Sequence, residues 1–176
     1  MITIRQAVIG DLYFINAIYN HYIEHSAITF DVEPWPISQR LQWCQTVFKE
    51  KRHTLLVAVK DDTIIGFAYN SAFKLKEAYE SSTELTVYKA PNCNIKGVGR
   101  ALYRQLLTNV KQHNYHRAYA WVTLPNEASM HLHKGLGFND VGTMAQVGKK
   151  FDQFHDVALL EKVINCESSL EEESAA

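Results

Sequence analysis

The stretch Thr83-Glu84-Leu85-Thr86-Val87-Tyr88-Lys89, followed shortly by Asn94-Ile95-Lys96-Gly97-Val98-Gly99-Arg100-Ala101-Leu102, decides the fold. The first part carries β-branched residues, as is typical of a strand, and one carboxylate. The second part is a basic loop with two glycines that leads into an amphipathic helix. Unpaired N–H groups at a helix start attract anions, and glycine lets a phosphate approach the backbone. The pattern predicts a phosphate-bearing ligand close to Glu84.

Two nucleotide-binding loops do not fit this stretch. The dinucleotide fingerprint needs a third small residue three positions after Gly99, where this chain has Leu102, and an acidic residue farther on. No Asp or Glu occurs between Gly97 and Asn126. The Walker loop needs Lys-Ser or Lys-Thr after a glycine at a fixed spacing, which is also missing. A tight strand-to-helix turn without a ligand remains the alternative.

Several other stretches extend the pattern along the chain. They are Gly66-Phe67-Ala68-Tyr69, Leu124-Pro125-Asn126, Leu132-His133-Lys134-Gly135-Leu136-Gly137-Phe138, Gly148-Lys149-Lys150 and His155-Asp156-Val157. With the glycine loop, they resemble the GNAT superfamily of N-acetyltransferases, and most closely its phosphinothricin and methionine-sulfone (methionine sulfoximine) acetyltransferase branch. The resemblance extends from Ile4 to about Val163. Asn94 stands where the family's motif A usually has Gln or Arg.

The resemblance implies an α/β fold with a mixed sheet, and acetyl-CoA as co-substrate. It implies cofactor contacts at Val87, Tyr88, Lys89, Ile95, Lys96, Gly97, Val98, Gly99, Arg100, Asn126 and Ser129. Glu84 is expected to act as a general base that takes a proton from an ammonium acceptor, directly or through one water. His133 is expected to be a second acid/base group near the thioester sulfur. The alternatives are a rim position or a salt bridge for Glu84, a helix-surface or packed histidine for His133, and an ordinary helix N-cap for Asn126.

The acceptor pocket is expected at Phe30, Phe73, Lys74, Lys76 and Tyr79. Lys74 and Lys76 are two residues apart, so in an extended backbone they would face one carboxylate. The acceptor would be a small amino acid or an analogue of the phosphinothricin or methionine sulfone type. For the aromatic residues the alternative is core packing, and for the lysines a solvated loop.

Acetyl transfer is expected to be direct, in a ternary complex without a covalent enzyme intermediate. Two other functions stay open. One is an acetyl-CoA-binding sensor, suggested by Asn94. The other is acetylation of protein N-termini or lysines, which would favour an open acidic groove. A screen of free amino acids for thiol release from acetyl-CoA would distinguish these functions.

Composition excludes several classes of protein. The chain has 176 residues, 47% hydrophobic and 21% charged, with a net charge of −1. A general nucleic-acid binder would need a clustered basic excess. The three cysteines are widely spaced, and neither a signal peptide nor a membrane-spanning segment is recognisable, so a reduced, cytoplasmic protein is expected. A homodimer is expected from the family and from a free strand edge near the C-terminus.

A metal site is not expected. The run His21-Tyr22-Ile23-Glu24-His25 matches an inverted zinc-protease motif, but such a site needs a third ligand from elsewhere. His131 and His133 are two residues apart and diverge on a helix.

Hydrophobic periodicity predicts one domain over residues 1–165 and a mobile acidic tail over 166–176. Helices are expected at 11–24, at 38–48 with Ser38 as cap, from 98 to about 110, and from Asn126. Strands are expected at 2–7, 54–60, 63–73, 83–89, 118–123, 138–148 and 154–163.

Overall fold

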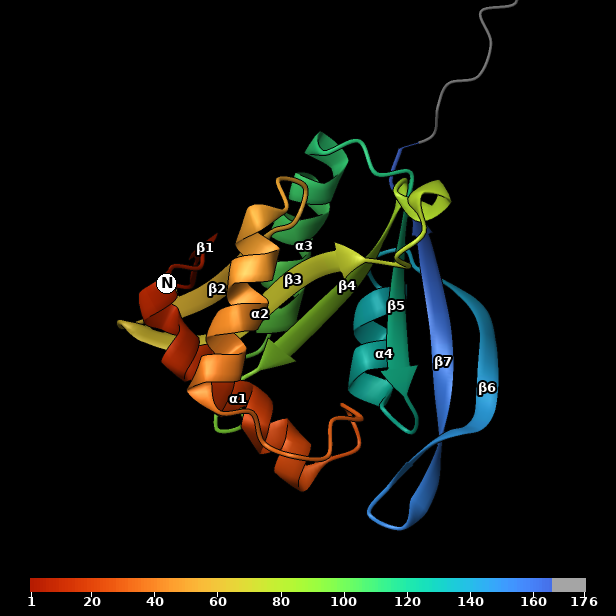
Figure 1. Cartoon of the computed structure of the whole chain (residues 1–176), viewed down its shortest axis with the longest axis horizontal. Helices are drawn as coiled ribbons and strands as arrows, with labels where there is room; N and C mark the ends of the chain where they lie inside the picture. Colours follow the sequence, from red (N-terminus) through yellow and green to blue (C-terminus); the bar gives the residue numbers. More distant parts are fainter. Residues whose placement is uncertain (166–176) are drawn as a thin grey trace, which may run out of the picture.

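A twisted sheet of seven strands runs through the computed structural model, which describes residues 1–165 (Figure 1). The expected tail at 166–176 lies outside the described residues. The spatial order is β1-β2-β3-β4-β5-β7-β6, and β4 and β5 are the one parallel pair among these strands. The strands are β1 (Thr3–Gln6), β2 (Leu55–Lys60), β3 (Thr63–Ala72), β4 (Ser82–Lys89), β5 (Arg117–Thr123), β6 (Asn139–Lys150) and β7 (Gln153–Val163).

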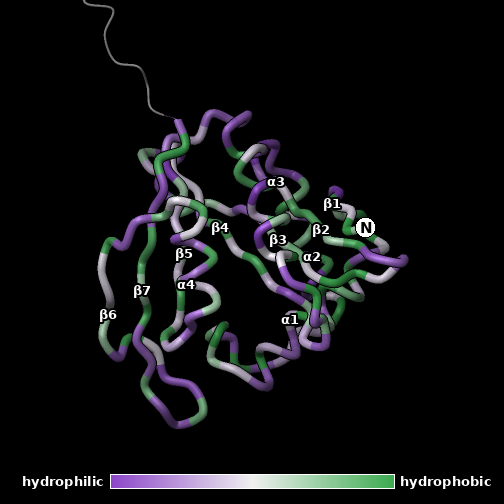
Figure 2. The backbone as a smooth tube through the Cα atoms, turned by 180° about the vertical axis from the view of Figure 1, so that it is seen from behind, coloured by the Kyte–Doolittle hydropathy of each residue, from purple (hydrophilic) through white to green (hydrophobic). Residues whose placement is uncertain are grey.

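Four α-helices cover the sheet on both faces. They are α1 (Leu12–His25), α2 (Ile37–Lys49), α3 (Val98–Gln112) and α4 (Glu127–Lys134), with 3-10 helices η1 (Ile9–Asp11) and η2 (Glu77–Tyr79). Helices α1 and α2 lie on one face, and α3 and α4 on the other (Figures 1 and 2). The predicted order of helices and strands is confirmed. Within residues 1–165, none of the helices has the length and apolar character needed to cross a membrane.

The expected cap of α2 is wrong. The helix begins at Ile37, Pro36 occupies the N-cap position, and no side chain caps it. Proline has a fixed φ that suits the start of a helix, so α2 begins two residues earlier than it would with Ser38 as its N-cap.

The sheet separates two hydrophobic cores. Val98, Leu102, Leu106 and Val110 of α3 are each fully buried against one face. Helix α1 buries Ile15 and other apolar residues against the opposite face. Because successive residues of β4 point to opposite faces, Leu85 and Val87 face α3, whereas Tyr88 packs with α1. The alternation of hydrophobic and hydrophilic colour along α3 follows its single buried face (Figure 2).

The connection between α1 and α2 is held by polar contacts. The Asn16 side-chain amide donates to the Trp35 carbonyl (2.8 Å), and the Arg40 Nε donates to the Asn16 Oδ1 (3.2 Å). Arg40 is 1% exposed, and its guanidinium lies 4.2 Å from the ring centre of Trp35 and 4.4 Å from that of Tyr19. Burial lowers the pKa of Arg40, because the charged form loses water. Aromatic faces replace part of that water through cation–π attraction.

Replacing Arg40 tests how much this anchor stabilises the fold. We expect Arg40→Ala to lower the free energy of unfolding by about 2–5 kcal/mol, since it leaves a cavity between three aromatic rings and an unpaired Asn16 oxygen. Arg40→Met fills the same space without a buried charge and should lose less than half as much. Urea unfolding followed by circular dichroism measures both. Equal stability of the alanine variant and the wild type would show that the aromatic cluster holds without Arg40.

Candidate active site

The two parallel strands at the centre of the sheet separate. Their pairing ends at Glu84↔Tyr119, although β4 continues to Lys89 and β5 to Thr123. The amide of Ala90 donates to the Ile65 carbonyl of β3, so backbone groups of every second residue before it also point to β3. Those of Leu85, Val87 and Lys89 therefore point into the gap.

Tyrosine hydroxyls from two helices reach the backbone in this gap. The Tyr103 hydroxyl of α3 lies 3.2 Å from the Leu85 carbonyl, and the Tyr22 hydroxyl of α1 donates to the Lys89 carbonyl (2.7 Å). Between them, the Val87 N–H faces the gap. A buried backbone N–H or C=O group needs a hydrogen-bond partner. Because the strands separate, the β4 groups that face the gap are available to side chains or a ligand.

A cavity of about 510 Å³ occupies the gap and continues along α3 and α4. It brings together every residue expected to contact the cofactor, and also His133. Its lining comprises Leu85 to Lys89, Ile95 to Arg100 and Tyr103, Trp121 to Thr123, Asn126, Ala128, Ser129, His131 to His133, and Tyr22 and Ile28 of the opposite layer. A pocket that joins a strand gap to a helix start suits a long, narrow ligand.

The glycine loop opens α3 as the sequence predicts. Gly97 is the N-cap in the left-handed region, at φ 84°, which favours glycine. The Gly97 carbonyl accepts the Ala101 amide, so the N–H groups of the first turn point outward at the positive end of the helix. Gly99 has a second use. A Cβ there would lie 3.2 Å from the Leu132 Cδ2, so glycine also lets α4 approach α3.

Basic side chains surround the loop end of the cavity. Lys89, Lys96, Arg100 and His131 all line it. A Cβ built on Gly135 would lie 2.7 Å from the Arg100 Nη2, so this guanidinium rests against the C-terminal end of α4. Helix N-terminal amides and cationic side chains together match phosphate groups. The residues present therefore fit a phosphorylated ligand.

Asn126 is an N-cap, as the sequence allowed. Its Oδ1 accepts the Ser129 amide (3.1 Å) at the start of α4. Both residues also line the cavity, so the capping role does not remove them from the ligand surface.

His133 is buried and fully engaged. It is 3% exposed, and its Nδ1 donates to the Ser129 carbonyl (2.7 Å) because a carbonyl can only accept. Burial lowers the pKa of His133, so the ring is neutral at pH 7 and its Nε2 carries a lone pair. The Tyr103 hydroxyl, 2.8 Å away, donates to that Nε2. This pairing could not be predicted from the sequence, because the two residues are thirty positions apart.

Glu84 lies on the other face of the sheet from α3, at the point where β4 and β5 part. Burial raises the pKa of its carboxyl, against the opposing effects of Trp121 and the positive charge of Lys74. Phe73 stacks on Tyr119 with ring centres 4.2 Å apart, and the Lys74 Nζ lies 5.9 Å from the Trp121 ring. This group of side chains forms an aromatic wall beside one carboxylate.

The expected acceptor residues are only partly brought together. Phe73 lies 6.0 Å from the ring of Tyr79 and beside Lys74. The segment that carries the lysines is bent and leads into η2, so the expectation that Lys74 and Lys76 share one side of an extended chain is wrong. The backbone turns there because η2 follows directly. Lys76 is exposed, and its contact with an acceptor stays a prediction.

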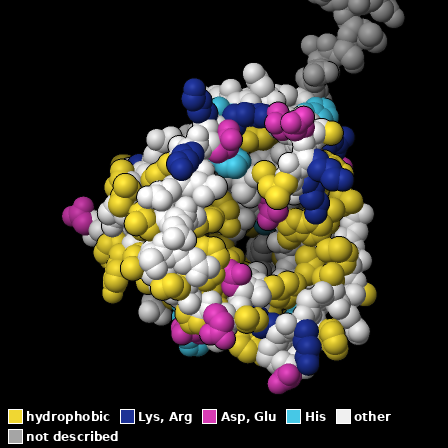
Figure 3. Space-filling model, viewed as in Figure 1, with side chains coloured by type: hydrophobic (Ala, Val, Ile, Leu, Met, Phe, Trp, Pro, Cys, Tyr) yellow, Lys and Arg dark blue, Asp and Glu magenta, His cyan; other side chains and the backbone are white. Residues whose placement is uncertain are grey.

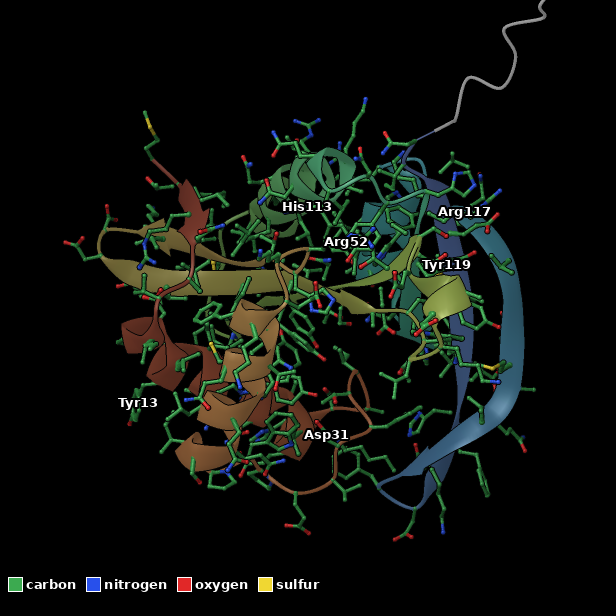
Figure 4. All side chains as sticks on the ribbon, turned by 45° about the horizontal axis from the view of Figure 1, so that its top comes forward. Tyr13, Asp31, Arg52, His113, Arg117 and Tyr119 are labelled. Carbon is green, nitrogen blue, oxygen red and sulfur yellow. The ribbon has the colours of Figure 1, made fainter. Side chains whose placement is uncertain are left out.

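Phe30 comes from the connection between α1 and α2, and contacts β6 and β7 rather than the Phe73 wall. The face that carries α1 and α2 is hollowed near its centre, with apolar side chains around the hollow (Figure 3). Asp31 on this connection and Tyr119 on β5 lie on opposite sides of the opening (Figure 4). Tyr119 and Trp121 were not identified from the sequence, because their alternation on β5 resembles that of any strand.

The described part of the chain contains no cluster of side chains suited to a metal ion. Within residues 1–165, no group of three His, Cys, Asp or Glu side chains is arranged to hold an ion. The rings of His21 and His25 stack with centres 4.5 Å apart, and the His25 Nδ1 lies 3.0 Å from the His21 carbonyl.

Comparison with known proteins identifies the family. Residues 15–138 match the acetyltransferase (GNAT) family. A phosphinothricin N-acetyltransferase of Streptomyces coelicolor is 39% identical over 163 residues, which cover 92% of this chain and 95% of that protein. An L-methionine sulfoximine/L-methionine sulfone acetyltransferase of Pseudomonas aeruginosa is 28% identical, with 90% and 92% covered.

A solved structure agrees with these matches. The phosphinothricin acetyltransferase of Sinorhizobium meliloti in complex with acetyl-CoA superposes with a TM-score of 0.88 at 28% identity, covering 92% of this chain and 88% of that one. The resemblance drawn from the glycine loop and the flanking motifs is thereby confirmed, and the chain belongs to the GNAT family of N-acetyltransferases.

Proposed function

We propose that the protein transfers the acetyl group of acetyl-CoA to the amino group of a small amino-acid-like acceptor, within a ternary complex. The observation that carries the proposal is the gap between β4 and β5, with a phosphate-type cradle on one side and Glu84 on the other. Relatives that act on phosphinothricin and on methionine sulfone or sulfoximine support this acceptor class.

The loop from Ile95 to Arg100 and the start of α3 would hold the pyrophosphate of acetyl-CoA through backbone N–H groups. Lys96 and Lys89 would add positive charge. Asn94 lacks the charge of an arginine at this place, but the backbone donors do not depend on that side chain. The thioester supplies the electrophilic carbonyl, and the Val87 N–H faces the place where its oxygen gains charge.

Glu84 is the proposed general base. An amine acceptor arrives as an ammonium ion and must lose a proton before it can attack. Because burial raises the pKa of Glu84, its carboxylate binds that proton more firmly than an exposed glutamate would. Lys74 and Trp121 keep the pKa from rising further.

The Tyr103–His133 pair is proposed to serve the leaving thiolate. Neutral His133 has used its one N–H on Ser129, so its Nε2 has no proton to give. The hydroxyl hydrogen of Tyr103 is the polar hydrogen of the pair nearest the gap. Rotation of the Tyr103 hydroxyl from the His133 Nε2 toward the gap would aim this hydrogen at sulfur, while His133 holds the hydroxyl at the gap before the thiolate forms.

The acceptor would bind on the α1 and α2 face. Phe73, Tyr119 and Trp121 offer an aromatic wall, and Lys74 can attract a carboxylate. A role as an acetyl-CoA sensor would leave the half-buried Glu84 without use. Acetylation of proteins is less well supported. In a peptide acceptor the free α-carboxylate is replaced by a peptide bond, which offers Lys74 no negative charge.

We also propose a homodimer, as the sequence led us to expect. Strand β6 is the edge of the sheet and is exposed along most of its length, with Val141 and Val147 each about half exposed. An exposed edge with apolar residues favours pairing with another chain. Cytoplasmic location stays a prediction.

Gly99 tests the cradle. We expect Gly99→Asp to abolish measurable acetyl-CoA binding by calorimetry, because a carboxylate would stand among the donors that hold phosphate. Gly99→Ala is the matched control, since it adds the Cβ near Leu132 without the charge and should keep most of the affinity. Unchanged binding by a folded Gly99→Asp protein would remove the loop from the cofactor site.

Glu84 tests the chemistry. Glu84→Gln should lower kcat by about 10² to 10⁴-fold and leave the Kd for acetyl-CoA unchanged. In the wild type, kcat should fall as the pH drops through the raised pKa of Glu84, above the range usual for glutamate, because only the ionised form accepts a proton. The variant should lack that pH dependence. Glu50→Gln, at an exposed site after α2, is the control. Full activity of Glu84→Gln would return Glu84 to a structural role.

The acceptor class is tested with acid and amide pairs. Methionine sulfone and phosphinothricin should each release thiol from acetyl-CoA, whereas their carboxamides should show KM values raised about tenfold or more, since Lys74 loses a charged partner. Lys74→Met should reduce the difference between acid and amide. Equal rates on both members of each pair would favour peptide acetylation instead.

A further inference from the structure

The connection between α1 and α2 crosses the open end of the strand gap. On one side, the Tyr19 hydroxyl lies 3.0 Å from the Thr29 Oγ1 and donates to the Asp31 carboxylate (2.6 Å). The Tyr19 ring also packs edge-on against Tyr88 of β4, with centres 5.1 Å apart. Thr29 is thereby fixed beside the last residues of β4. The preceding Ile28 lines the central cavity.

On the other side, the same connection is fastened to β6. Lys150 is 4% exposed, and its Nζ donates to the Thr29 carbonyl (2.8 Å), a contact between residues 121 positions apart. A buried ammonium is costly unless a polar group receives it. Burial lowers the pKa of Lys150, and Asp31 partly offsets that effect through its charge. Burying an ammonium group in a surface hairpin costs free energy. This cost indicates that the contact between Lys150 and Thr29 serves the structure or the function.

Phe30 closes the remaining space between the connection and the hairpin. A Cβ built on Gly148 would lie 2.2 Å from the Phe30 ring, so the ring rests directly on the glycine backbone. The ring also lies 6.2 Å from that of His155 on β7. Strand β7 in turn pairs with β5 up to Thr123↔Val157. These contacts form a closed rim around the gap. The rim consists of β4, the Thr29–Phe30 segment, the hairpin of β6 and β7, and β5.

We propose that Lys150 is a positioning residue that sets the largest acceptor side chain the enzyme accepts, by locking the Thr29–Phe30 segment across the mouth of the acceptor site. The inference rests on the proposed function. A closed rim gives the hollow on this face a fixed width (Figure 3). Cutting the Lys150 contact frees the segment to move outward, so longer side chains fit, while the cofactor cradle on the far face is untouched.

The test compares two acceptors that share the free amino and carboxylate groups, namely methionine sulfone and its S-butyl counterpart. Wild-type enzyme should strongly prefer the methyl compound. Lys150→Met keeps the chain length and removes the ammonium, and should raise the ratio of kcat/KM for butyl over methyl about tenfold, with the KM for acetyl-CoA unchanged. Lys149→Met is the matched control, because Lys149 is the adjacent lysine with a 55% exposed side chain.

A second measurement does not depend on activity. Hydrogen exchange over residues 26–36 should become faster in Lys150→Met but not in Lys149→Met. Gly148→Ala must displace the Phe30 ring and should raise the butyl-to-methyl ratio as well, which covers the case in which Lys150→Met fails to fold.

The outcomes separate the two proposals. If the wild type acetylates methionine sulfone but the ratio is the same in the Lys150 and Gly148 variants, the rim does not select acceptors and the inference is overturned, while the proposed function stands. Faster exchange with an unchanged ratio overturns it equally, since the contact would then be structural alone. If the wild type acetylates neither compound, the proposed acceptor class fails first.

Discussion

The early end of pairing between β4 and β5 is the constraint on which the site depends. Parallel neighbours normally share hydrogen bonds along their length, and here the pairing ends at Glu84↔Tyr119 while both strands continue. Side chains from helices on opposite faces reach the freed backbone groups: the Tyr22 hydroxyl donates to the Lys89 carbonyl, and the Tyr103 hydroxyl lies 3.2 Å from the Leu85 carbonyl. The gap is thus a stable defect, held open by the layers that cover it. In the proposed function, it would give two substrates access to one point from opposite sides of the sheet.

Electrostatics divides this gap into regions with different tasks. The start of α3 and the nearby Lys89 and Lys96 make one end positive without burying a charge, because backbone dipoles provide much of the field. Glu84 at the other side is half-buried and has a raised pKa, whereas burial lowers the pKa of His133. The pKa of Glu84 therefore shifts up toward that of histidine, and the pKa of His133 shifts down toward that of glutamate. Desolvation, which destabilises each charged form, also suits these groups to proton transfer.

Local patterns in the sequence predicted most of the fold. The buried face of the helix from Val98, the strands expected at 54–60 and 63–73 and the cap at Asn126 are decided by neighbours within a few residues, and all are present. The site was predicted where a motif is continuous, as in the loop at Gly97. The pair of Tyr103 and His133, the wall of Tyr119 and Trp121, and the contact of Lys150 with Thr29 arise from tertiary packing, which leaves no periodic signal. For Lys74 and Lys76 the sequence prediction was wrong for another reason. The rule that residues two apart face the same way holds for an extended chain, but the backbone is bent here.

The position of β7 between β5 and β6 has a consequence for the growing chain. Strand β6 leaves the ribosome before β7, yet in the sheet it lies beyond β7 and pairs with it. Until β7 is synthesised, β6 and its Lys150 have no place in the sheet, and the segment around Thr29 has its contacts with Tyr19 but lacks the one with Lys150. Contacts this distant in sequence form late and slow folding. A nascent chain that already holds the glycine loop and α3 therefore still lacks part of the proposed acceptor site, so acetylation activity should appear only after β7 has been synthesised.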